Sequence, residues 1–487
     1  MSLKDYTNLT LHTDDYEINM MQTYFSKKME NRRAVFEVFF RTMPFENGYA
    51  VFAGLEHVID YINNLHFTDD DIKYLAEHGE YTPEFLDFLS HFKFKGTIRS
   101  AQEGDLVFNN EPIMQVEGSL AECQLVETAI LNIVNYQTLI ATKASRIRQA
   151  AGDDQLMEFG TRRAQETAAA LWGTRAAFIG GFNSTSNVLA GKSFGIPVSG
   201  THAHSLVETF GHDYDAFMAY AQTHHDCVFL VDTYDTIKSG VPNAIKVAKQ
   251  MGDQIHFAGV RIDSGDMAYL SKRIREMLDD AGFTDTKIIA SNDLDENTIT
   301  SLKMQDAKID VWGVGTKLIT AFDQPALGAV YKMVSVEQSD GQMRDTIKIS
   351  NNAAKVSTPG KKQVWRINKQ SDGKSEGDYI ALSDEDPRHQ DSLYMFHPQF
   401  TYINKTLTDF EATPLLRTII ENGKLVYKMP SLVEIQAHAN QALASLWPEY
   451  KRQMNPQDYP VDLSKKCWDN KMNLIESVHN YVQHLNY

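Results

Sequence analysis

The sequence predicts an α/β protein, with an irregular (β/α) barrel similar to a TIM barrel and a second, mixed α+β domain built from the N- and C-terminal segments. From about residue 155, short apolar runs alternate with helix-length amphipathic segments, which is typical of a parallel sheet covered by helices. The two ends of the chain instead mix strand-like and helix-like pieces. We therefore expect residues 136–345 to form the barrel, and residues 1–135 and 346–487 to pack together as one discontinuous domain.

The first segment contains signals for several strands and helices. The run RAVFEVFFRTMP (33–44) is rich in aromatic and branched residues and predicts a strand. Residues 69–79 and 82–92 begin with Asp and Thr, which favour helix starts. Residues 97–119 predict a small β-unit with a turn at Asn-Asn-Glu-Pro. Apolar residues at helical spacing predict a long helix over 120–151.

The strands of the expected barrel are marked by the runs LMEFG, IPVSG, VFLVD, FAGVRID, KIIASND and VWGVG, and LGAVYKMV (327–334) is a further candidate. About seven strands over roughly 190 residues suit a barrel, and a doubly wound open sheet is the alternative. After about residue 345 the pattern changes to hairpins and polar turns. The chain then ends in two helical stretches, near 431–453 and 463–486.

The composition indicates a soluble, globular protein. Of the 487 residues, 43% are hydrophobic and 23% are charged, which suits a large core and argues against disorder. The formal net charge of −17 argues against a nucleic-acid binder, because such a surface repels phosphate backbones. The three cysteines lie far apart and form no disulfide or zinc pattern. We expect a cytoplasmic protein with no signal peptide and no membrane span.

Polar residues follow nearly every predicted strand, at the end where parallel β/α folds place their sites. They are Thr161, Arg162 and Arg163; Gly200, Thr201, His202 and His204; Asp232 and Thr233; Arg261, Asp263, Ser264, Gly265 and Asp266; Ser291, Asn292 and Asp293; and Gly313, Gly315, Thr316 and Lys317. A barrel without a site would not require such residues at every strand. The set predicts a pocket for an anionic, phosphorylated sugar.

Three of these motifs suit different parts of such a ligand. The GVGTK segment (313–317) can expose backbone N–H groups to a phosphate, although an ordinary Gly-rich turn is the simpler interpretation. In RIDSGD (261–266), the arginine suits a phosphate and an aspartate suits ribose hydroxyls or hydrated Mg²⁺. For Asp266 alone we expect a helix N-cap. Of the adjacent Arg162 and Arg163, one is free to meet a ligand carboxylate or phosphate.

Two histidines, His202 and His204, stand one residue apart and leave three interpretations open. As a metal pair they would resemble the first two ligands of the metal-dependent amidohydrolases. That site needs further ligands after later strands, and only Asp232 and Asp263 could contribute. We favour this interpretation least. As a nucleophile, a neutral histidine can accept a phosphoryl group when its other nitrogen is held by an acceptor. In the third interpretation one histidine only binds the backbone, which we expect of His202.

Several motifs occur in order along most of the chain. They are TDDYEINMM (13–21), FEVFFRTMPFENGYAVFAGL (36–55), EFGTRRAQ (158–165), GGFNSTSNVLAGKSFGIPVSGTHAHS (180–205), RIDSGD, GVGTKLIT (313–320) and STPGKKQVWR (357–366). Together they resemble the nicotinate phosphoribosyltransferase family. The resemblance implies that nicotinate reacts with 5-phosphoribosyl-1-pyrophosphate to give nicotinate mononucleotide and pyrophosphate. It also implies Mg²⁺ on the substrate phosphates, no metal ion resident in the protein itself, and ATP as a co-substrate.

The resemblance further implies that ATP acts through a transient phosphohistidine. The family's histidine stands in G-T-x-A-H-S, which falls on His204, and His202 occupies the variable position. His204, Arg261 and Asp263 would be the catalytic residues. Arg261, with the amides of Gly313 and Gly315, would hold the 5′-phosphate. The ribose would meet Asp263 and also Asp293.

The pyridine ring would lie between Tyr16 and Phe159, which suits offset stacking. We expect Tyr16 before the first regular element, and the resemblance implies that it comes from the partner chain of a homodimer with shared active sites. Arg162 or Arg163 would meet the carboxylate of nicotinate. The remaining substrate-binding positions are Thr201, Ser205, Ser264, Gly265, Asn292 and Thr316. The alternatives are a nicotinamide- or quinolinate-using phosphoribosyltransferase, a metal-dependent barrel amidohydrolase and a non-catalytic binding protein.

Overall fold

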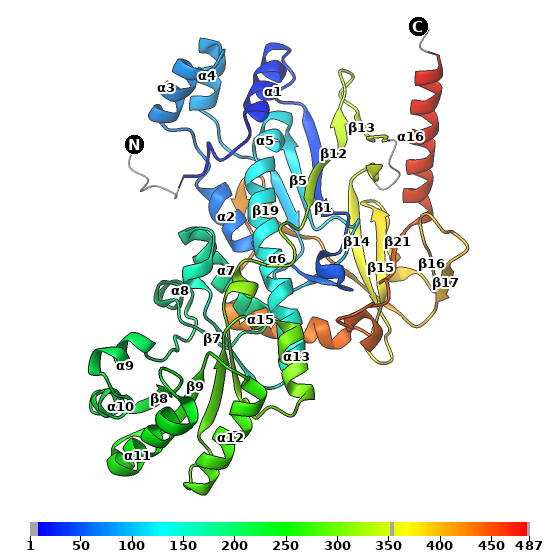
Figure 1. The fold of residues 1–487 in the computed structure, drawn as a ribbon. Coiled ribbons are helices and arrows are strands. Elements are labelled where there is room, and N and C mark those ends of the chain that lie inside the picture. Colours follow the sequence, from blue (N-terminus) through cyan, green and yellow to red (C-terminus); the bar gives the residue numbers. More distant parts are fainter. Residues whose placement is uncertain (1–7, 351–354, 485–487) are drawn as a thin grey trace. The chain divides into compact units, whose positions relative to one another are not determined.

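The structure of the chain is a computed structural model that describes residues 8–350 and 355–484, so part of the segment tested for a signal peptide lies outside the described residues. Contacts divide the chain into unit 1, Met1–Leu139 with Ala326–Tyr487, and unit 2, Ile140–Pro325. Figure 1 shows the elements of both units, coloured along the sequence. The expected barrel segment, 136–345, extends past the observed end of unit 2.

Unit 2 contains one six-stranded parallel sheet. The strands lie in the order β7 (Ser184–Thr185), β6 (Gln155–Glu158), β11 (Val311–Val314), β10 (Lys287–Ser291), β9 (His256–Ile262) and β8 (Asp226–Leu230). The first strand along the chain, β6, pairs with the last, β11, so the sheet curls into a half-barrel. Within the described residues β7 and β8 remain edges, so the predicted α/β class is confirmed, whereas closure into the expected irregular barrel is not.

The gap in the half-barrel lies where the run IPVSG was expected to form a strand. Val198 makes only an isolated parallel bridge with Thr185, and the Ser199 N–H donates to the Thr185 carbonyl at 2.9 Å. Pro197 has no N–H to donate, and Gly200 adds no side chain to pack. The segment therefore contributes one bridge instead of a strand.

Helices follow the strands of unit 2, as the alternating pattern predicted. They are α7 (Thr167–Ile179), α8 (Val188–Phe194), α9 (His204–Phe210), α10 (Asp213–Ala221), α11 (Val241–Met251), α12 (Met267–Asp280), α13 (Glu296–Met304) and α14 (Thr316–Ile319). Figure 1 shows α9 to α12 gathered beside β8 and β9. Helix α12 begins after Asp266, whose side chain accepts the Tyr269 N–H at 3.0 Å, so the predicted N-cap is confirmed.

The candidate strand LGAVYKMV belongs to unit 1 and not to the half-barrel. It forms part of β12 (Ala329–Glu337), which pairs antiparallel with β1 (Arg33–Phe40). The rings of Phe36 and Tyr331 stack across this pair with centroids 4.8 Å apart. A short apolar run fits either sheet, so only its pairing partner distinguishes them.

Unit 1 contains a seven-stranded sheet and smaller sheets. The order in the large sheet is β13 (Met343–Asp345), β12, β1, β5 (Met114–Ser119), β3 (Thr97–Ser100), β19 (Arg417–Glu421) and β20 (Lys424–Leu425). The smaller sheets contain β18 (Glu411–Pro414), β14 (Lys362–Asn368), β15 (Ser375–Leu382) and β21 (Val461–Leu463); β16 (Leu393–Phe396) and β17 (Asn404–Leu407); and β2 (Ala50–Val51) and β4 (Leu106–Val107). Because β19 pairs with β3, the two ends of the chain share one sheet.

Four helices of unit 1 lie close to their predicted ranges: α3 (Asp69–His78), α4 (Pro83–Ser90), α15 (Leu432–Ser445) and α16 (Lys465–Gln483). The single helix predicted over 120–151 is divided into α5 (Leu120–Leu125) and α6 (Glu127–Ala151), which continues into unit 2. Two further helices, α1 (Asp15–Ser26) and α2 (Leu55–Asn63), were not predicted. The side chains of Thr68, Ser119 and Ser431 form capping boxes, which explains where α3, α5 and α15 begin.

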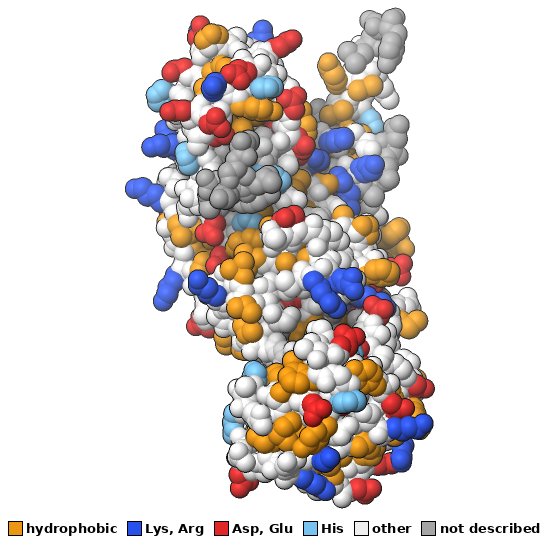
Figure 2. Space-filling view, turned by 60° about the vertical axis from the view of Figure 1, so that its left-hand side comes forward, with side chains coloured by type: hydrophobic (Ala, Val, Ile, Leu, Met, Phe, Trp, Pro, Cys, Tyr) orange, Lys and Arg blue, Asp and Glu red, His pale blue; other side chains and the backbone are white. Residues whose placement is uncertain are grey.

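The surface mixes charged and apolar side chains. On the face shown in Figure 2, acidic and basic residues are mixed and do not form one large basic field, in keeping with the net charge of −17. Among the described residues, no helix has the length and apolar character needed to cross a bilayer.

Candidate active site

Polar side chains meet at the carboxyl ends of three adjacent strands of unit 2. Asp232 and Thr233 follow β8, Asp263 follows β9, and Ser291 is the last residue of β10. Because parallel strands bring these ends to one edge of the sheet, the side chains lie together. Helix α9 adds His204, which is its first residue.

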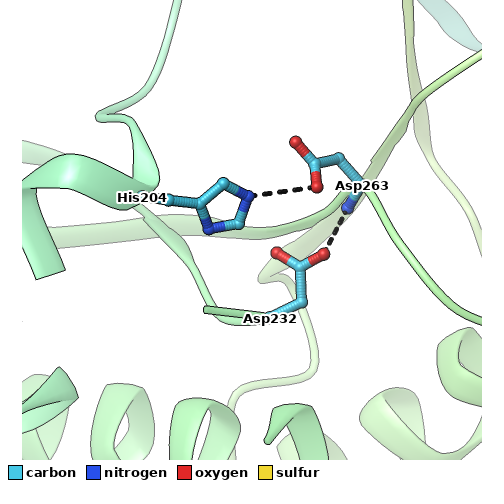
Figure 3. A group of neighbouring side chains, drawn as sticks. All are labelled: His204, Asp232 and Asp263. Carbon is cyan, nitrogen blue, oxygen red and sulfur yellow. Dashed lines mark hydrogen bonds and ion pairs between the residues drawn. The ribbon is translucent and has the colours of Figure 1, made fainter. Parts of the chain in front are cut away.

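His204 is held through both ring nitrogens, and Figure 3 shows its contact with Asp263. Its Nε2 lies 3.1 Å from Oδ1 of Asp263, and its Nδ1 lies 3.0 Å from Oγ1 of Thr233. An ionised carboxylate only accepts hydrogen bonds, so in the neutral ring Nε2 carries the proton and Nδ1 accepts from the threonine hydroxyl. This arrangement leaves the lone pair on Nδ1, where a nucleophile requires it.

Asp232 supports the loop that carries Asp263. Its Oδ2 accepts the Asp263 N–H at 2.9 Å and the Ser264 hydroxyl at 2.6 Å. Its Oδ1 is buried and has no hydrogen-bond partner within the described residues. Burial raises the pKa of Asp232, against the hydrogen bonds that lower it. The partnerless oxygen marks a position where a cation would be stabilised.

The same three side chains form a possible cation site. His204, Asp232 and Asp263 each offer one ligand atom, and these atoms lie within 4.8 Å of one another. Mg²⁺ prefers carboxylate oxygens and keeps several water or phosphate ligands, so Asp232 and Asp263 fit it. A zinc site of the amidohydrolase type would need His202 as well.

His202 points away from this group. Its Nε2 accepts the Leu230 N–H at 3.2 Å, its Nδ1 lies 3.3 Å from the Ala203 carbonyl, and its ring packs against Phe217 and Tyr220. Burial lowers the pKa of His202 and keeps the ring neutral. The expected backbone contact is therefore present, and the two histidines do not form a metal pair.

Arg261 links the ends of β9 and β10 to the segment before α9. Its Nε donates to Ser291 Oγ at 2.9 Å and its Nη1 to Thr201 Oγ1 at 2.8 Å, while Nη2 lies 3.5 Å from Oδ2 of Asp263. Burial lowers the pKa of Arg261, although the nearby carboxylates act in the opposite direction. The guanidinium is thus fixed by two hydroxyls and retains further N–H donors for an anion.

Phe159 lies against Gly313. We expected the Gly313 N–H to face a phosphate, but the structure gives this glycine a packing role. Gly313 is inside β11, paired with Ser291 and Met157, and not in the turn after the strand. A Cβ at this position would lie 2.7 Å from two carbons of the Phe159 ring. Gly313 therefore makes room for the ring of Phe159, whose centroid lies 5.4 Å from the Arg261 guanidinium carbon. The backbone of Gly313 belongs to the sheet.

The loop after Phe159 presents both arginines to solvent. Thr161–Arg163 forms a 3₁₀ turn in which Arg162 and Arg163 are exposed. Arg162 is close enough to Arg261 to lower the pKa of that guanidinium, so Arg162 is the arginine on the Arg261 side. Gly315 and Thr316 stand at the start of α14, and Lys317 is tied to Asp295 at 2.8 Å.

Family models and a curated relative identify this arrangement. The models of the nicotinate phosphoribosyltransferase (NAPRTase) N-terminal domain, the NAPRTase family and the C-terminal domain match residues 11–135, 155–374 and 361–471. The nicotinate phosphoribosyltransferase of Bacillus subtilis (strain 168) is 60% identical over 476 residues, which are 98% of this chain and 97% of the relative. The chain belongs to the nicotinate phosphoribosyltransferase family.

More distant members of the family agree. The nicotinate phosphoribosyltransferase of Caenorhabditis elegans is 37% identical over 528 aligned positions, which cover 94% of this chain and 92% of the relative. The crystal structure of human nicotinic acid phosphoribosyltransferase superimposes with a TM-score of 0.85 at 30% identity, over 95% of this chain and 99% of that one. The chain is therefore an enzyme, and the predicted resemblance is confirmed.

The other positions implied by the family resemblance surround this group, and Ser264 is bonded to it through Asp232. Ser205, Ser264 and Gly265 are exposed near it, and Asn292 and Asp293 follow β10 with positive φ values of 97° and 45°. Such backbone is uncommon outside glycine and is often held in place at functional sites.

Tyr16, by contrast, lies in unit 1, as the second residue of α1 and 46% exposed. Our expectation that it precedes the first regular element was therefore wrong.

Two residues of the family member's site had no predicted role. Thr233 and Ser291 were noted only as strand-end residues, yet their hydroxyls hold His204 and Arg261. Their position directly at the ends of β8 and β10 is the signal that could have found them.

Gly313→Ala should lower the free energy of unfolding by about 1–3 kcal/mol, because its methyl group overlaps the Phe159 ring. Chemical denaturation measures the change. Gly200→Ala is the control, since a Cβ there meets nothing within 4 Å, and we expect a shift within about 1 kcal/mol. Equal stabilities of the two variants would show that the ring does not depend on the glycine.

Proposed function

We propose that the chain joins nicotinate to 5-phosphoribosyl-1-pyrophosphate, releasing nicotinate mononucleotide and pyrophosphate, and couples this reaction to ATP hydrolysis through a phosphohistidine at His204. The observation that carries the proposal is the placement of His204 between Asp263 and Thr233, beside Arg261, in a chain of this family. The reaction serves the synthesis of pyridine nucleotides, in which nicotinate mononucleotide is a precursor of NAD.

In the proposed ATP step, Nδ1 of His204 attacks the γ-phosphorus. The N–P bond forms as the bond from phosphorus to the ADP oxygen breaks, and water later releases the phosphate. The Nε2 proton stays on the ring, and Asp263 at 3.1 Å offsets the positive charge that the ring acquires. Phosphorylation of His204 would change the binding of the substrates and draw the reaction toward the mononucleotide.

The pyridine ring is proposed to stack on Phe159, and Arg162 to meet its carboxylate, because Arg162 is the arginine on the Arg261 side. A guanidinium binds a carboxylate through two parallel hydrogen bonds. Tyr16 would cover the other face of the ring from the partner chain of a homodimer, and its exposure in unit 1 leaves the ring accessible for this. Arg163 would remain a solvent-facing cation.

The phosphoribosyl group is proposed to lie along the strand ends. Arg261 and the amides of Gly315 and Thr316 would meet the 5′-phosphate. The ribose hydroxyls would meet Asp263 and Asp293. The neighbouring positions would complete this part of the site: Thr201, Ser205, Ser264, Gly265 and Asn292.

Asp232 and Asp263 would hold Mg²⁺ through their oxygens, as the partnerless Oδ1 of Asp232 suggests. When bound, the ion neutralises charge on the substrate phosphates. The protein itself has little acid–base work to do, because the ring nitrogen of nicotinate is already a nucleophile. The side chains must align the two substrates as pyrophosphate leaves and ribose C1 gains positive charge, and they must exclude water.

Product analysis tests this function. We expect mononucleotide from nicotinate and little from nicotinamide, because the amide would leave the Arg162 cation without its charged partner, a loss of about 2–5 kcal/mol when such a partner is buried. The protein is mixed with 5-phosphoribosyl-1-pyrophosphate, Mg²⁺ and either substrate, with and without ATP. Comparable turnover of nicotinamide, or turnover of quinolinate instead, would assign the chain to a relative with another substrate.

We also propose that the enzyme works in the cytoplasm, since all three cysteines are buried and unpaired, as a reducing compartment allows. The shared site of the homodimer can be tested by mixing Tyr16→Ala with His204→Ala protein. Hybrid dimers should regain part of the activity, whereas a fully active monomer in sizing and kinetics would contradict the shared site.

A further inference from the structure

Glu158 is a buried carboxyl group at the end of β6, one residue before Phe159. Glu158 is only 1% exposed to solvent. In the ranges that the structure describes, the groups that touch it are a backbone N–H and two hydroxyls, with no cation among them. A buried carboxyl group without a cation destabilises a fold unless its oxygens are well bonded, so its position requires a reason.

The contacts of Glu158 join three elements. Its Oε1 accepts the Gly160 N–H. Its Oε2 lies 2.6 Å from Oγ1 of Thr185 on β7 and 3.0 Å from Oγ1 of Thr174 on α7. The Thr185 hydroxyl also accepts the Asn187 N–H at 2.9 Å, so its single hydrogen is left for Glu158. The carboxyl group thus ties the loop after β6 to two elements behind it.

The loop held in this way carries the proposed pyridine-binding residues. The Phe159 N–H donates to the Val314 carbonyl at 2.8 Å, and the Gly160 carbonyl accepts the Arg163 N–H at 2.7 Å. Gly160 is therefore the point from which the turn of Arg162 and Arg163 starts. Its N–H is fixed by Glu158, and a Cβ on it would lie 2.6 Å from Cβ of Ile319, so the loop cannot move toward that side.

We propose that Glu158 is a positioning residue for nicotinate: it does not touch the substrate, but it fixes Gly160 and thereby sets where Phe159 and Arg162 meet the pyridine ring and its carboxylate. The inference rests on the proposed function and extends it to a residue outside the group around His204. A displacement of about 1 Å in such a loop can change a rate by about 10²-fold.

The hydrogen-bond pattern also explains why an amide cannot replace the carboxyl group. The Thr174 hydroxyl lies 2.8 Å from the Ala170 carbonyl, and its single hydrogen cannot serve both neighbours. Burial raises the pKa of Glu158, and the neutral acid satisfies every group: Oε2–H donates to Thr174, Thr174 donates to Ala170, and Thr185 donates to Oε2. In Glu158→Gln an NH₂ group at the Oε2 position cannot accept from Thr185, and in the flipped amide the NH₂ group at the Oε1 position cannot accept the Gly160 N–H.

Glu158→Gln and Thr185→Val test the proposal in the full-length enzyme. Each is expected to raise the KM for nicotinate by about tenfold or more. The KM for 5-phosphoribosyl-1-pyrophosphate and the rate of ATP hydrolysis should remain within about twofold of wild type, because the groups at 201–204, 232–233 and 261–264 keep their contacts. Initial-rate kinetics with each substrate varied in turn measures this split.

Two controls separate positioning from stability. Thr185→Ser keeps the hydroxyl and should restore the wild-type KM for nicotinate. Thr286→Val removes a buried hydroxyl bonded to the Phe257 carbonyl at 3.0 Å in the same unit, far along the chain from the loop, and should leave the KM for nicotinate unchanged. If Glu158→Gln does not fold, the Thr185→Val and Thr185→Ser pair decides the question.

The proposal is overturned if the folded variants keep the wild-type KM for nicotinate. It is also overturned if the KM for 5-phosphoribosyl-1-pyrophosphate rises and the rate of ATP hydrolysis falls as strongly as the KM for nicotinate rises. A wild-type protein that makes no nicotinate mononucleotide would instead refute the proposed function, so the two failures are distinguishable.

Discussion

His204→Ala is expected to lower ATP hydrolysis by about 10³-fold or more, the scale on which loss of a catalytic nucleophile acts. The ring that would accept the phosphoryl group is removed, and Asp263 and Thr233 lose their hydrogen bonds to its two nitrogens. Stimulation of synthesis by ATP should disappear with it. Slow ATP-independent synthesis should persist, because Phe159, Arg162 and Arg261 do not depend on the imidazole for their main contacts. Initial rates with and without ATP measure both effects.

His202→Ala is the matched control, since the two histidines are one residue apart and differ in direction. His202 accepts the Leu230 N–H and packs on aromatic rings. Its loss should therefore lower the free energy of unfolding by about 0.5–3 kcal/mol while ATP hydrolysis continues. Acid-labile label from γ-labelled ATP, followed by peptide mapping, identifies the acceptor. Label that survives in His204→Ala and is lost in His202→Ala would show the opposite assignment.

Asp263→Asn should slow ATP hydrolysis by about 10²–10⁴-fold, by analogy with other histidines that lose a carboxylate partner. The amide oxygen can still accept the Nε2 proton of His204, but it offers no negative charge to the phosphorylated ring. It also removes one of the two proposed Mg²⁺ ligands. The steady-state level of labelled His204 and the initial rate of hydrolysis report the loss.

Asp266→Asn serves as the control for Asp263→Asn, because it makes the same substitution three residues later. Asp266 caps α12 through the Tyr269 N–H, and asparagine caps helices about as well as aspartate. Its kinetics should match wild type within about twofold. An unchanged rate of ATP hydrolysis in Asp263→Asn would mean that the charge at 263 has no part in the ATP step.

Much of unit 2 could be predicted because parallel, buried strands are continuous apolar runs. The runs of β6, β8, β9, β10 and β11 all form strands, and polar residues at their ends do gather. The open edge of the sheet at β7 could not be predicted, since the expected strand at Val198 makes one bridge and not a ladder. For β12 the apolar pattern was correct, but its partner, β1, is about 300 residues away in sequence, a pairing that periodicity does not encode.

In the site, residue type predicted chemistry better than it predicted contacts. His204, Arg261 and Asp263 lie together because each directly follows or belongs to a neighbouring strand or helix start. Gly313 was misplaced, because a glycine inside a strand and a glycine in a turn look alike when the strand's end is unknown. Thr233 and Ser291 carry no charge, so their part as supports became visible only from their hydroxyl contacts.

The insertion of unit 2 between the two parts of unit 1 sets an order for synthesis on the ribosome. All strands of the half-barrel are present once Pro325 has been made. The seven-stranded sheet must wait for β12 and β13, and then for β19 and β20, which ends at Leu425. While residues 120–328 are being added, β1 and β3 each lack one of the strands that flank them in the finished sheet, and β3 lacks β19 until Glu421 has been made. Unpaired strand edges of this kind invite association with other chains, so we expect the nascent chain to be most prone to association while residues 120–328 are being added.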